Sequence, residues 1–239
     1  MDATTTDRSA EARSSIQGLL LVDKPAGMTS HDVVQHVRRV YGERSIGHLG
    51  TLDPFATGLL VLLIGRATRL ATFLDTEPKV YEALIRFGAE TDTDDQTGTV
   101  IRTADPPSEH DVWSGIETLT GTISQIPPAY SAKSVDGTRA YDAARRGDAL
   151  DLPPVDVTVH SWEIRELSRE TLSAVITCGG GTYIRSLARD LGRLTSSAAH
   201  LSSLRRTRAG EFDVRDAATL ESLAAGPARI RALRVVPDA

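Results

Sequence analysis

Residues 47–64 read GHLGTLDPFATGLLVLLI, a glycine-rich loop that leads directly into an unbroken apolar run. The run 59–64 has the length and composition of a strand that is buried on both faces. Pro54 keeps Asp53 out of helical geometry, because the proline ring clashes with the backbone of the preceding residue. A carboxylate therefore lies on a rigid loop beside a core strand, a common place for functional side chains. An aspartate before proline is also a common turn former, so the pattern alone leaves both interpretations open.

The spacing of apolar residues around this stretch predicts an α+β fold. We expect further strands at 18–23, 80–87, 155–167, 171–178 and 201–212. Helices are predicted at 66–74, 111–119, 138–146, 182–194 and 217–225, with one more that begins at Thr29 or Ser30 and ends at Gly42. Residues 45–58 are expected to form a loop. Strands often follow one another without a helix between them, which favours a central mixed, mostly antiparallel sheet flanked by helices and loops.

The composition is typical of a globular chain. Of the 239 residues, 40% are hydrophobic and 25% are charged, which is the ordinary range for this class. The longest apolar run, 59–64, is far too short to span a bilayer. A single cysteine, Cys178, fits a reducing compartment, so we expect a cytoplasmic location. Residues 1–17 lack the apolar core of a secretory signal and are predicted to be a disordered tail.

The distribution of charge says more about partners than the net charge of −5 does, because local fields bind phosphates. Residues 185–208 carry Arg185, Arg189, Arg193, Arg205, Arg206 and Arg208 against Asp190 alone. This run either forms one wall of an RNA groove or is a solvated basic face on an acidic protein.

Several classes of chemistry have no pattern in this sequence. There is no phosphate-binding Gly-x-x-x-x-Gly-Lys-Ser/Thr motif and no Gly-x-Gly-x-x-Gly after a strand, so we expect no nucleotide cofactor. The six histidines are scattered and the single cysteine leaves no zinc pattern, so we expect no metal. The chemistry should therefore come from carboxylate, tyrosine, lysine and arginine side chains.

The pattern Gly-His-x-Gly-x-Leu-Asp-Pro-x-Ala-Thr-Gly around Asp53 resembles the catalytic motif of the TruB family of tRNA pseudouridine synthases. Further blocks resemble that family in the family's order, at 21–30, 79–81, 91–94, 127–132, 181–185 and 204–212. The resemblance covers about 18–212 and implies a pseudouridine synthase fold. It also implies an isomerase that converts the uridine at position 55 in the T-arm of tRNA to pseudouridine.

The resemblance implies a role for each matched residue. Asp53 is the essential catalytic aspartate, because a carboxylate can act as nucleophile or base at the sugar. Arg185 pairs with Asp53 and favours its ionised form. Tyr81 stacks on the target base, and Tyr183 and Leu204 line the uracil pocket. Without the resemblance, these last four residues read as a helix-surface arginine and ordinary core packing.

Two further matched residues flank the loop. His48 resembles the histidine that enters the RNA stack when the target uridine is flipped out; alone it reads as a loop histidine. Lys24 resembles a substrate-site lysine that either contacts phosphate or braces the Asp53 loop, and a simple Lys-Pro turn is the alternative. Leu49 departs from the family, which usually has threonine there, and this puts fine substrate contacts in doubt but not the reaction class.

The resemblance also implies a domain organisation and a partner. A catalytic domain is expected at 18–212, with an RNA-gripping insertion at about 124–151, in which Lys133, Arg139, Arg145 and Arg146 are the basic residues. A short helical extension is expected at 213–239, without the C-terminal RNA-binding domain of the PUA type that longer members carry. We expect a monomer that binds the T-arm stem-loop of tRNA and has no membrane partner.

Two other functions stay open. A tRNA-folding chaperone would act by binding the T-arm alone, so a variant without catalysis would still promote folding. A guide-RNA-dependent synthase that modifies ribosomal RNA would use the same catalytic residues but would need a guide.

Overall fold

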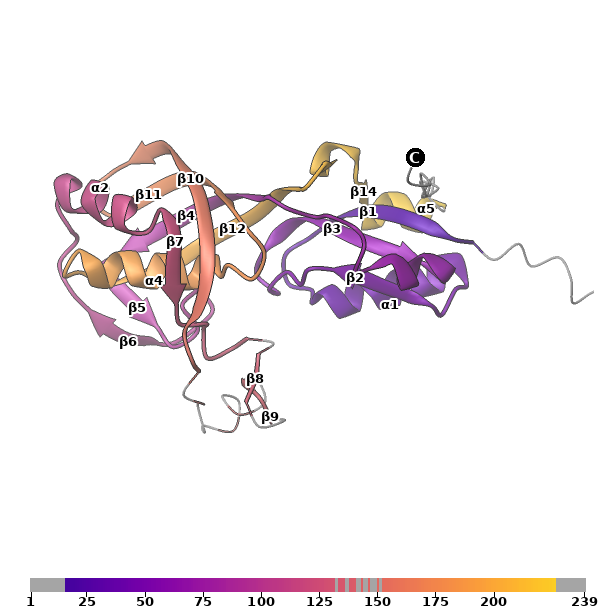
Figure 1. The fold of residues 1–239 in the computed structure, drawn as a ribbon, viewed down its shortest axis with the longest axis horizontal. Helices are drawn as coiled ribbons and strands as arrows, with labels where there is room; N and C mark the ends of the chain where they lie inside the picture. Colours follow the sequence, from indigo (N-terminus) through magenta and orange to yellow (C-terminus); the bar gives the residue numbers. More distant parts are fainter. Residues whose placement is uncertain are drawn as a thin grey trace, which may run out of the picture.

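The computed structural model describes residues 16–131, 133–135, 138–140, 143, 146, 150 and 152–226. Within these residues, one sheet of ten strands runs through the molecule (Figure 1). The strands are β1 (Gly18–Lys24), β2 (Ile46–Leu49), β3 (Thr57–Ile64), β4 (Lys79–Phe87), β7 (Gly121–Gln125), β10 (Val155–Leu167), β11 (Thr171–Cys178), β12 (Ala199–Ala209), β13 (Phe212–Asp213) and β14 (Ala218–Thr219). Their order is β14-β1-β3-β12-β4-β11-β10-β7, with β13 beside β12 and β2 beside β3. In the described sheet only β1 with β14 and β3 with β12 pair in parallel, so the predicted mixed, mostly antiparallel sheet of an α+β fold is confirmed.

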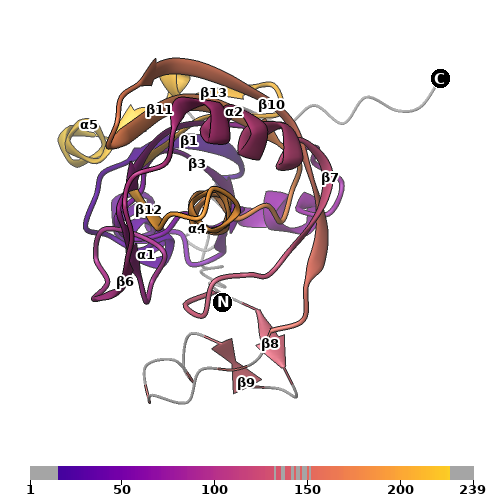
Figure 2. The ribbon, with the colours of Figure 1, turned by 90° about the vertical axis from the view of Figure 1, so that its left-hand side faces the viewer.

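Helices and two small hairpins flank this sheet. The helices are α1 (Ser30–Tyr41), α2 (Glu109–Thr118), α4 (Ile184–Leu194) and α5 (Leu220–Ala225), and the 3-10 helices are η1 (Gly65–Leu70) and η2 (Val214–Asp216). The hairpins pair β5 (Ala89–Thr91) with β6 (Val100–Thr103) and β8 (Ser134–Val135) with β9 (Thr138–Arg139). Helices α1 and α5 lie at one end of the molecule, and α2 and α4 at the other (Figure 1). Figure 2 looks nearly along α4, with β7, β10 and β11 curved around it.

Strand β3 is buried on both faces, as its unbroken apolar run predicts. Alternate side chains of a strand point to opposite faces, so its residues contribute to two different cores. One core contains Leu60, Leu62 and Ile64, and the other contains Leu59, Val61 and Leu63. The first core is closed by Val33 and Val37 of α1. The start of β3, and with it the end of the Asp53 loop, is therefore fixed by packing on both sides.

The ends of α1 are fixed by local sequence. Thr29 is the N-cap, and its hydroxyl accepts from the backbone N–H of Asp32 while the Asp32 carboxylate accepts from the backbone N–H of Thr29. Gly42 ends the helix with a φ of +64°, a left-handed conformation that glycine adopts without steric cost. Both predicted ends of this helix are confirmed.

The third core surrounds α4. The predicted inward-facing residues Ile184, Leu187, Ala188 and Leu191 are all buried there. They pack with the buried face of β4, which alternates as the sequence predicts and places Tyr81 toward the same core. Helix α4 is thus held along its length, and its first turn, which carries Arg185, is held with it.

The structure corrects two elements. Residues Ile46–Leu49, expected within a loop, form β2 and pair antiparallel with β3; two of its four residues are Gly47 and His48, which leaves no apolar alternation to read. The helix expected at 66–74 is the shorter 3-10 helix η1. Of the helix expected at 138–146, residues 141–142 and 144–145 lie outside the described residues, 138–139 belong to β9, and 140 and 143 are helical. Residues 1–15 of the predicted tail also lie outside the described residues. No helix within the described ranges is long and apolar enough to cross a membrane.

Gly58 lies where β3 approaches β12 most closely. It has a φ of +101°, and a Cβ atom there would lie 2.2 Å from the carbonyl oxygen of Arg206. We expect Gly58→Ala to lower the free energy of unfolding by about 2–4 kcal/mol, because overpacking and left-handed strain add. Urea denaturation measures this change. In Gly42→Ala, where a Cβ atom meets nothing within 4 Å, only the strain remains; equal losses in the two variants would contradict the close approach.

Candidate active site

A cavity of about 840 Å³ opens between the Asp53 loop, strands β4 and β12, and the first turn of α4. The residues that line it include six of the sequence-predicted site residues, namely His48, Asp53, Tyr81, Tyr183, Arg185 and Leu204. They come from segments far apart in the chain, so the fold brings them together as the resemblance implies. Of the predicted site residues, only Lys24 does not line the cavity.

The loop that carries Asp53 is pinned to α1. The hydroxyl of Ser30 accepts from the backbone N–H of Leu52 at 2.9 Å and donates to the carbonyl of Leu52 at 3.1 Å. Behind the loop, the ammonium of Lys24 donates to the carbonyl of Pro54 at 3.3 Å. Contacts on both sides of Asp53 in the sequence therefore fix the direction of its side chain.

Asp53 and Arg185 form a bidentate ion pair. Nε of Arg185 donates to Oδ2 of Asp53 at 2.9 Å, and Nη2 donates to Oδ1 at 2.8 Å. The Asp53 side chain is 30% exposed, whereas the Arg185 side chain is 4% exposed. The guanidinium thus holds the carboxylate from the protein side and leaves part of each oxygen facing the cavity.

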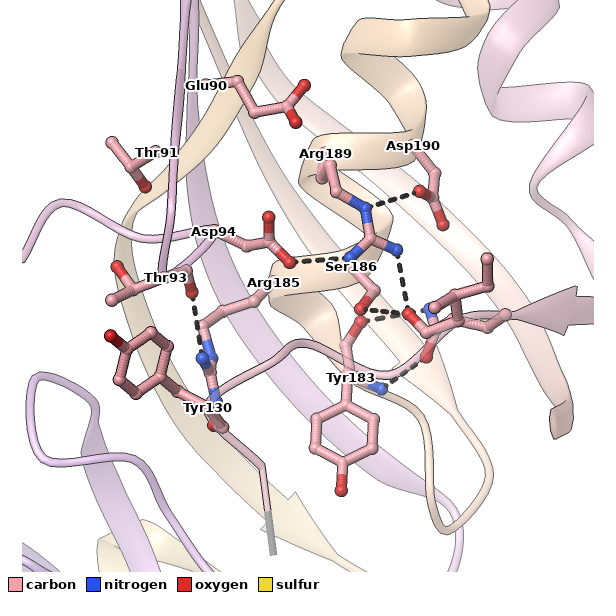
Figure 3. Close-up of polar contacts among 12 residues, drawn as sticks. Glu90, Thr91, Thr93, Asp94, Tyr130, Tyr183, Arg185, Ser186, Arg189 and Asp190 are labelled. Carbon is pink, nitrogen blue, oxygen red and sulfur yellow. Dashed lines mark hydrogen bonds and ion pairs between the residues drawn. The ribbon is translucent and has the colours of Figure 1, made fainter. Parts of the chain in front are cut away.

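The remaining N–H groups of Arg185 bind two other segments. Nη1 donates to the carbonyl of Thr93 at 2.9 Å, drawn in Figure 3, and Nη2 also donates to the carbonyl of Tyr130 at 2.9 Å. The carboxylate of Asp95 lies 3.8 Å from Nη1. A buried guanidinium needs partners for its five donors, and here three segments of the chain supply them.

Tyr183 caps the first turn of α4 and is held by its backbone. Its N–H donates to Oε1 of Gln125 at 2.9 Å, and its carbonyl accepts from Nε2 of Gln125 at 3.1 Å. Its side chain lines the cavity. Burial raises the pKa of the Tyr183 hydroxyl, so the phenol stays neutral near pH 7.

Tyr81 and Leu204 form the wall opposite the loop. They lie on the neighbouring strands β4 and β12 and are each 7% exposed. Burial raises the pKa of the Tyr81 hydroxyl, and the Arg206 guanidinium beside it acts in the opposite direction. This wall offers an apolar surface and a neutral phenol, a suitable surface for an aromatic base.

His48 lies on β2 at the edge of the same cavity. Burial, with a smaller contribution from Arg206, lowers the pKa of its imidazole, so the ring is neutral at pH 7. Its Nδ1 is buried and has no hydrogen-bond partner within the described part of the chain. A neutral ring at the cavity edge fits contact with a nucleic acid base better than contact with a phosphate.

Lys24 is placed differently from the other predicted site residues. It is fully buried, and its ammonium donates to the carbonyls of Pro25 at 2.9 Å and Met28 at 2.7 Å as well as to that of Pro54. This burial fits the alternative role of bracing the Asp53 loop, and contact of Lys24 with the substrate stays a prediction.

The burial of several arginines corrects the prediction made for the basic run 185–208. The backbone periods of α4 and β12 turn three of its six arginines inward, where they bind carboxylates and carbonyls. Arg185, Arg189 and Arg206 are buried, Arg193 pairs with Glu90, and Arg205 pairs with Asp23. Of the six arginines only Arg208 is exposed and outside any ion pair among the described residues, so the run as a whole is not a solvated basic face. Arg185 and Arg206 line the cavity, and contact of the run with RNA stays a prediction.

Sequence reasoning missed several residues of the site. Arg206 lines the cavity and donates from Nε to the carbonyl of Leu59 at 2.8 Å and from Nη2 to that of Gly50 at 3.1 Å. Lys79 also lines the cavity, and Asp95 approaches Arg185. The motif Lys79-Val-Tyr81 carried a signal for Lys79, whereas carbonyl partners leave no trace in a sequence. Among the described residues, no group of three or more His, Cys, Asp or Glu side chains is placed to hold a metal ion.

Comparison with known proteins assigns this fold and site to a family. Residues 38–184 match the family model of the TruB family pseudouridylate synthase (N terminal domain). Residues 185–233 match the tRNA pseudouridylate synthase B C-terminal domain. The chain therefore belongs to the TruB family of pseudouridylate synthases.

Individual relatives agree with this assignment. The chain is 50% identical over 218 residues to the tRNA pseudouridine synthase B of Thermobifida fusca, covering 87% of this chain and 74% of the relative. It is 50% identical over 220 residues to the protein of the same name from Leifsonia xyli, covering 87% and 73%. A crystal structure of a Cbf5-Nop10-Gar1 complex matches with a TM-score of 0.66 and 28% identity. That match covers 85% of this chain and 52% of the other, so this chain spans about half of its length.

Removing the Lys24 ammonium tests its bracing role. Burial lowers the pKa of Lys24 to about 8, so the charged form predominates at pH 7. We expect Lys24→Met to reduce the free energy of unfolding by about 1–3 kcal/mol, because three carbonyls lose a buried donor. Urea denaturation measures the loss, and Lys133→Met, at an exposed lysine, is the control. A Lys24→Met variant as stable as the control would argue against the brace.

Proposed function

We propose that this chain is a tRNA pseudouridine synthase that isomerises the uridine at position 55 in the T-arm, with Asp53 as its catalytic carboxylate. The observation that carries this proposal is the Asp53–Arg185 pair at the wall of a cavity lined by Tyr81, Tyr183 and Leu204. Family membership supports the reaction class, and the relatives named tRNA pseudouridine synthase B support tRNA as the substrate. Tyr81, Tyr183, Leu204 and His48 are proposed to contact the substrate.

The reaction needs no net oxidation or reduction. The C1′–N1 bond breaks, a C1′–C5 bond forms, the C5 proton leaves, and N1 gains a proton. A carboxylate is suited to this exchange as a nucleophile toward C1′ or C6, or as a base at C2′. Each of these routes requires a carboxylate at a fixed position, and the bidentate contact with the Arg185 guanidinium holds Asp53 in one. The cavity wall excludes water while the base is detached from the sugar.

The depth of the site supports base flipping. Tyr81 and Leu204 are almost fully buried, so a base stacked within a stem-loop does not reach them. A uridine that leaves the stack does reach them, and His48 at the cavity edge then faces the vacated position.

The domain division also stays a proposal: 18–212 as the catalytic unit, about 124–151 as its RNA-gripping insertion, and 213–239 as the extension.

A guide-RNA-dependent synthase is the second candidate, because the matched structures include an H/ACA RNP bound to a substrate RNA, with a TM-score of 0.63. That match is 28% identical and covers 51% of the other chain. The higher identity to tRNA pseudouridine synthase B favours turnover without a guide. Assays with a T-arm stem-loop alone therefore separate the two candidates.

Replacing the carboxylate of Asp53 tests the catalytic assignment. We expect Asp53→Asn to reduce single-turnover pseudouridine formation on a T-arm stem-loop by at least about 10⁴-fold while RNA affinity changes little, because an amide is no nucleophile or base. The matched control is Asp23→Asn, since Asp23 also pairs bidentately with an arginine, Arg205, outside the cavity. Asp23→Asn should retain wild-type turnover. Activity in Asp53→Asn would refute the assignment, and tRNA folding by that inactive variant would reveal a chaperone function.

Lys79 is the cation best placed to bind RNA phosphate at the cavity. It lines the cavity and is half-buried, and it has no ion pair with any described residue. We expect Lys79→Met to weaken RNA binding and to reduce the slope of log affinity against log salt by about one. Filter binding at several salt concentrations measures the slope. Arg86→Met, at an exposed arginine of the same strand outside the cavity, should leave the slope unchanged; equal effects of both variants would count against the contact.

A further inference from the structure

A second arginine follows Arg185 by one turn on the same face of α4. Arg189 is 8% exposed in its side chain and does not line the cavity. It donates from Nη1 to Oδ2 of Asp94 at 2.7 Å, from Nε to Oδ1 of Asp190 at 2.9 Å, and from Nη2 to the carbonyl of Ile126 at 2.8 Å (Figure 3). A buried guanidinium with three different acceptors holds all of them in one geometry.

Asp94 is the first of these acceptors, and it lies in the turn that binds Arg185. Its φ is +59°, a left-handed conformation that is uncommon outside glycine and that aspartate tolerates better than most residues. The preceding residue, Thr93, supplies a carbonyl to Arg185, and the following residue, Asp95, supplies a nearby carboxylate. The Arg189 contact therefore fixes the strained residue on which the direction of both neighbours depends.

The Ile126 carbonyl is the second acceptor, and it belongs to the other segment that binds Arg185. It accepts from Arg189 and also from the hydroxyl of Ser186 at 2.9 Å. The segment continues to Tyr130, whose carbonyl shares the Nη2 group of Arg185 with Asp53. Both segments that complete the coordination of Arg185 are thus anchored by Arg189.

We propose that Arg189 and Asp94 are positioning residues for the reaction, because they hold the two segments that orient Arg185 and hence the Asp53 carboxylate. This inference rests on the proposed function for its kinetic consequences. Neither residue touches the substrate. Their effect passes through Arg185, so they should change the rate of the chemical step more than the affinity for RNA. A displacement of about 1 Å at reacting groups costs on the order of 100-fold in rate.

The charge on Asp94 makes the positioning of Arg185 by Asp94 and Arg189 dependent on pH. The carboxylate faces Arg185, Arg189 and Arg193 of α4 and Glu90 of β5. Burial raises the pKa of Asp94 to about 6, although Arg189 acts in the opposite direction. Below pH 6 the carboxyl becomes neutral and its attraction to Arg189 weakens, so kcat should rise with pH through this range.

The contribution of Asp94 to the free energy of unfolding should fall over the pH range in which kcat rises. The folded pKa of Asp94 lies above its unfolded value of 3.8, so the folded state binds more protons between these two values. The contribution of Asp94 to the free energy of unfolding therefore falls as pH rises from about 4 to about 6. A gain in kcat over this range is consequently not a gain in stability.

The test compares Asp94→Asn, Arg189→Gln and a matched control, Arg193→Gln. Asparagine keeps the size of Asp94 and tolerates its left-handed backbone, so this variant is the one most certain to fold. Arg193 lies one turn further along α4 and pairs with the buried Glu90, but it contacts neither the 93–95 turn nor Ile126. We expect kcat to fall about 10- to 100-fold in the first two variants with KM within about twofold, and to stay unchanged in Arg193→Gln.

Two readouts distinguish positioning from general destabilisation. Asp94→Asn should lose the rise in kcat near pH 6, whereas Arg193→Gln should keep a rise that is displaced to higher pH, because one of the cations that face Asp94 is removed. The NMR signal of the Arg185 Nε–H, assigned through its loss in Arg185→Lys, should shift in Asp94→Asn and stay in place in Arg193→Gln. This signal does not require activity. If the wild type forms no pseudouridine but the signal shifts in Asp94→Asn, the proposed function is refuted and the positioning role is supported. Unchanged kcat, pH profile and signal in Asp94→Asn, or equal losses in Arg193→Gln, would overturn that role.

Discussion

The ion pair between Arg185 and Asp53 joins two residues that are 132 positions apart in the chain, and the site is built around it. A buried guanidinium is stable only when its donors are bound, and Arg185 binds the Asp53 loop, the 93–95 turn and the segment that ends at Tyr130. The pair therefore requires that all three segments reach α4. Burying such a pair contributes little net stability compared with apolar residues of the same size, whereas losing one partner costs about 3–5 kcal/mol. Its position is better explained by the need for an oriented carboxylate.

Most of the fold could be predicted from local patterns. The apolar run 59–64 identifies β3, the alternation after Lys79 identifies β4, and the cap residues identify α1, because in each case the signal and the element coincide in sequence. The catalytic loop could be found through the combination of Gly50, Asp53 and Pro54 with the other family blocks. Strand β2 could not, because its only evidence is its pairing with β3. The partners of Arg185 could not either, since two of them are backbone carbonyls and any residue supplies one.

The same limitation explains the error about the basic run. A run of arginines predicts a solvent-exposed surface, because unpaired cations are rarely buried. Here each inward arginine has an acceptor from elsewhere in the chain: Asp53 for Arg185, Asp94 for Arg189, and the carbonyls of Leu59 and Gly50 for Arg206. Three acidic residues, Glu90, Asp94 and Asp95, are buried as internal counter-charges to arginines. Net charge and local charge density say little about the surface when opposite charges meet inside the fold.

One part of the site, the Asp53 loop, is held rigidly, and another part is the uncharged wall formed by Tyr81 and Leu204. Lys24 holds the Asp53 loop from behind, Ser30 holds it from α1, and Arg185 holds the carboxylate itself. The wall formed by Tyr81 and Leu204 carries no charge at neutral pH, because one side chain is apolar and burial raises the pKa of the other. Isomerisation of a uridine requires the detached base to turn while the sugar keeps its place. In the proposed function, a fixed Asp53 carboxylate facing a neutral, apolar wall meets both requirements, because the carboxylate holds the sugar by geometry and the wall opposes rotation of the base only weakly.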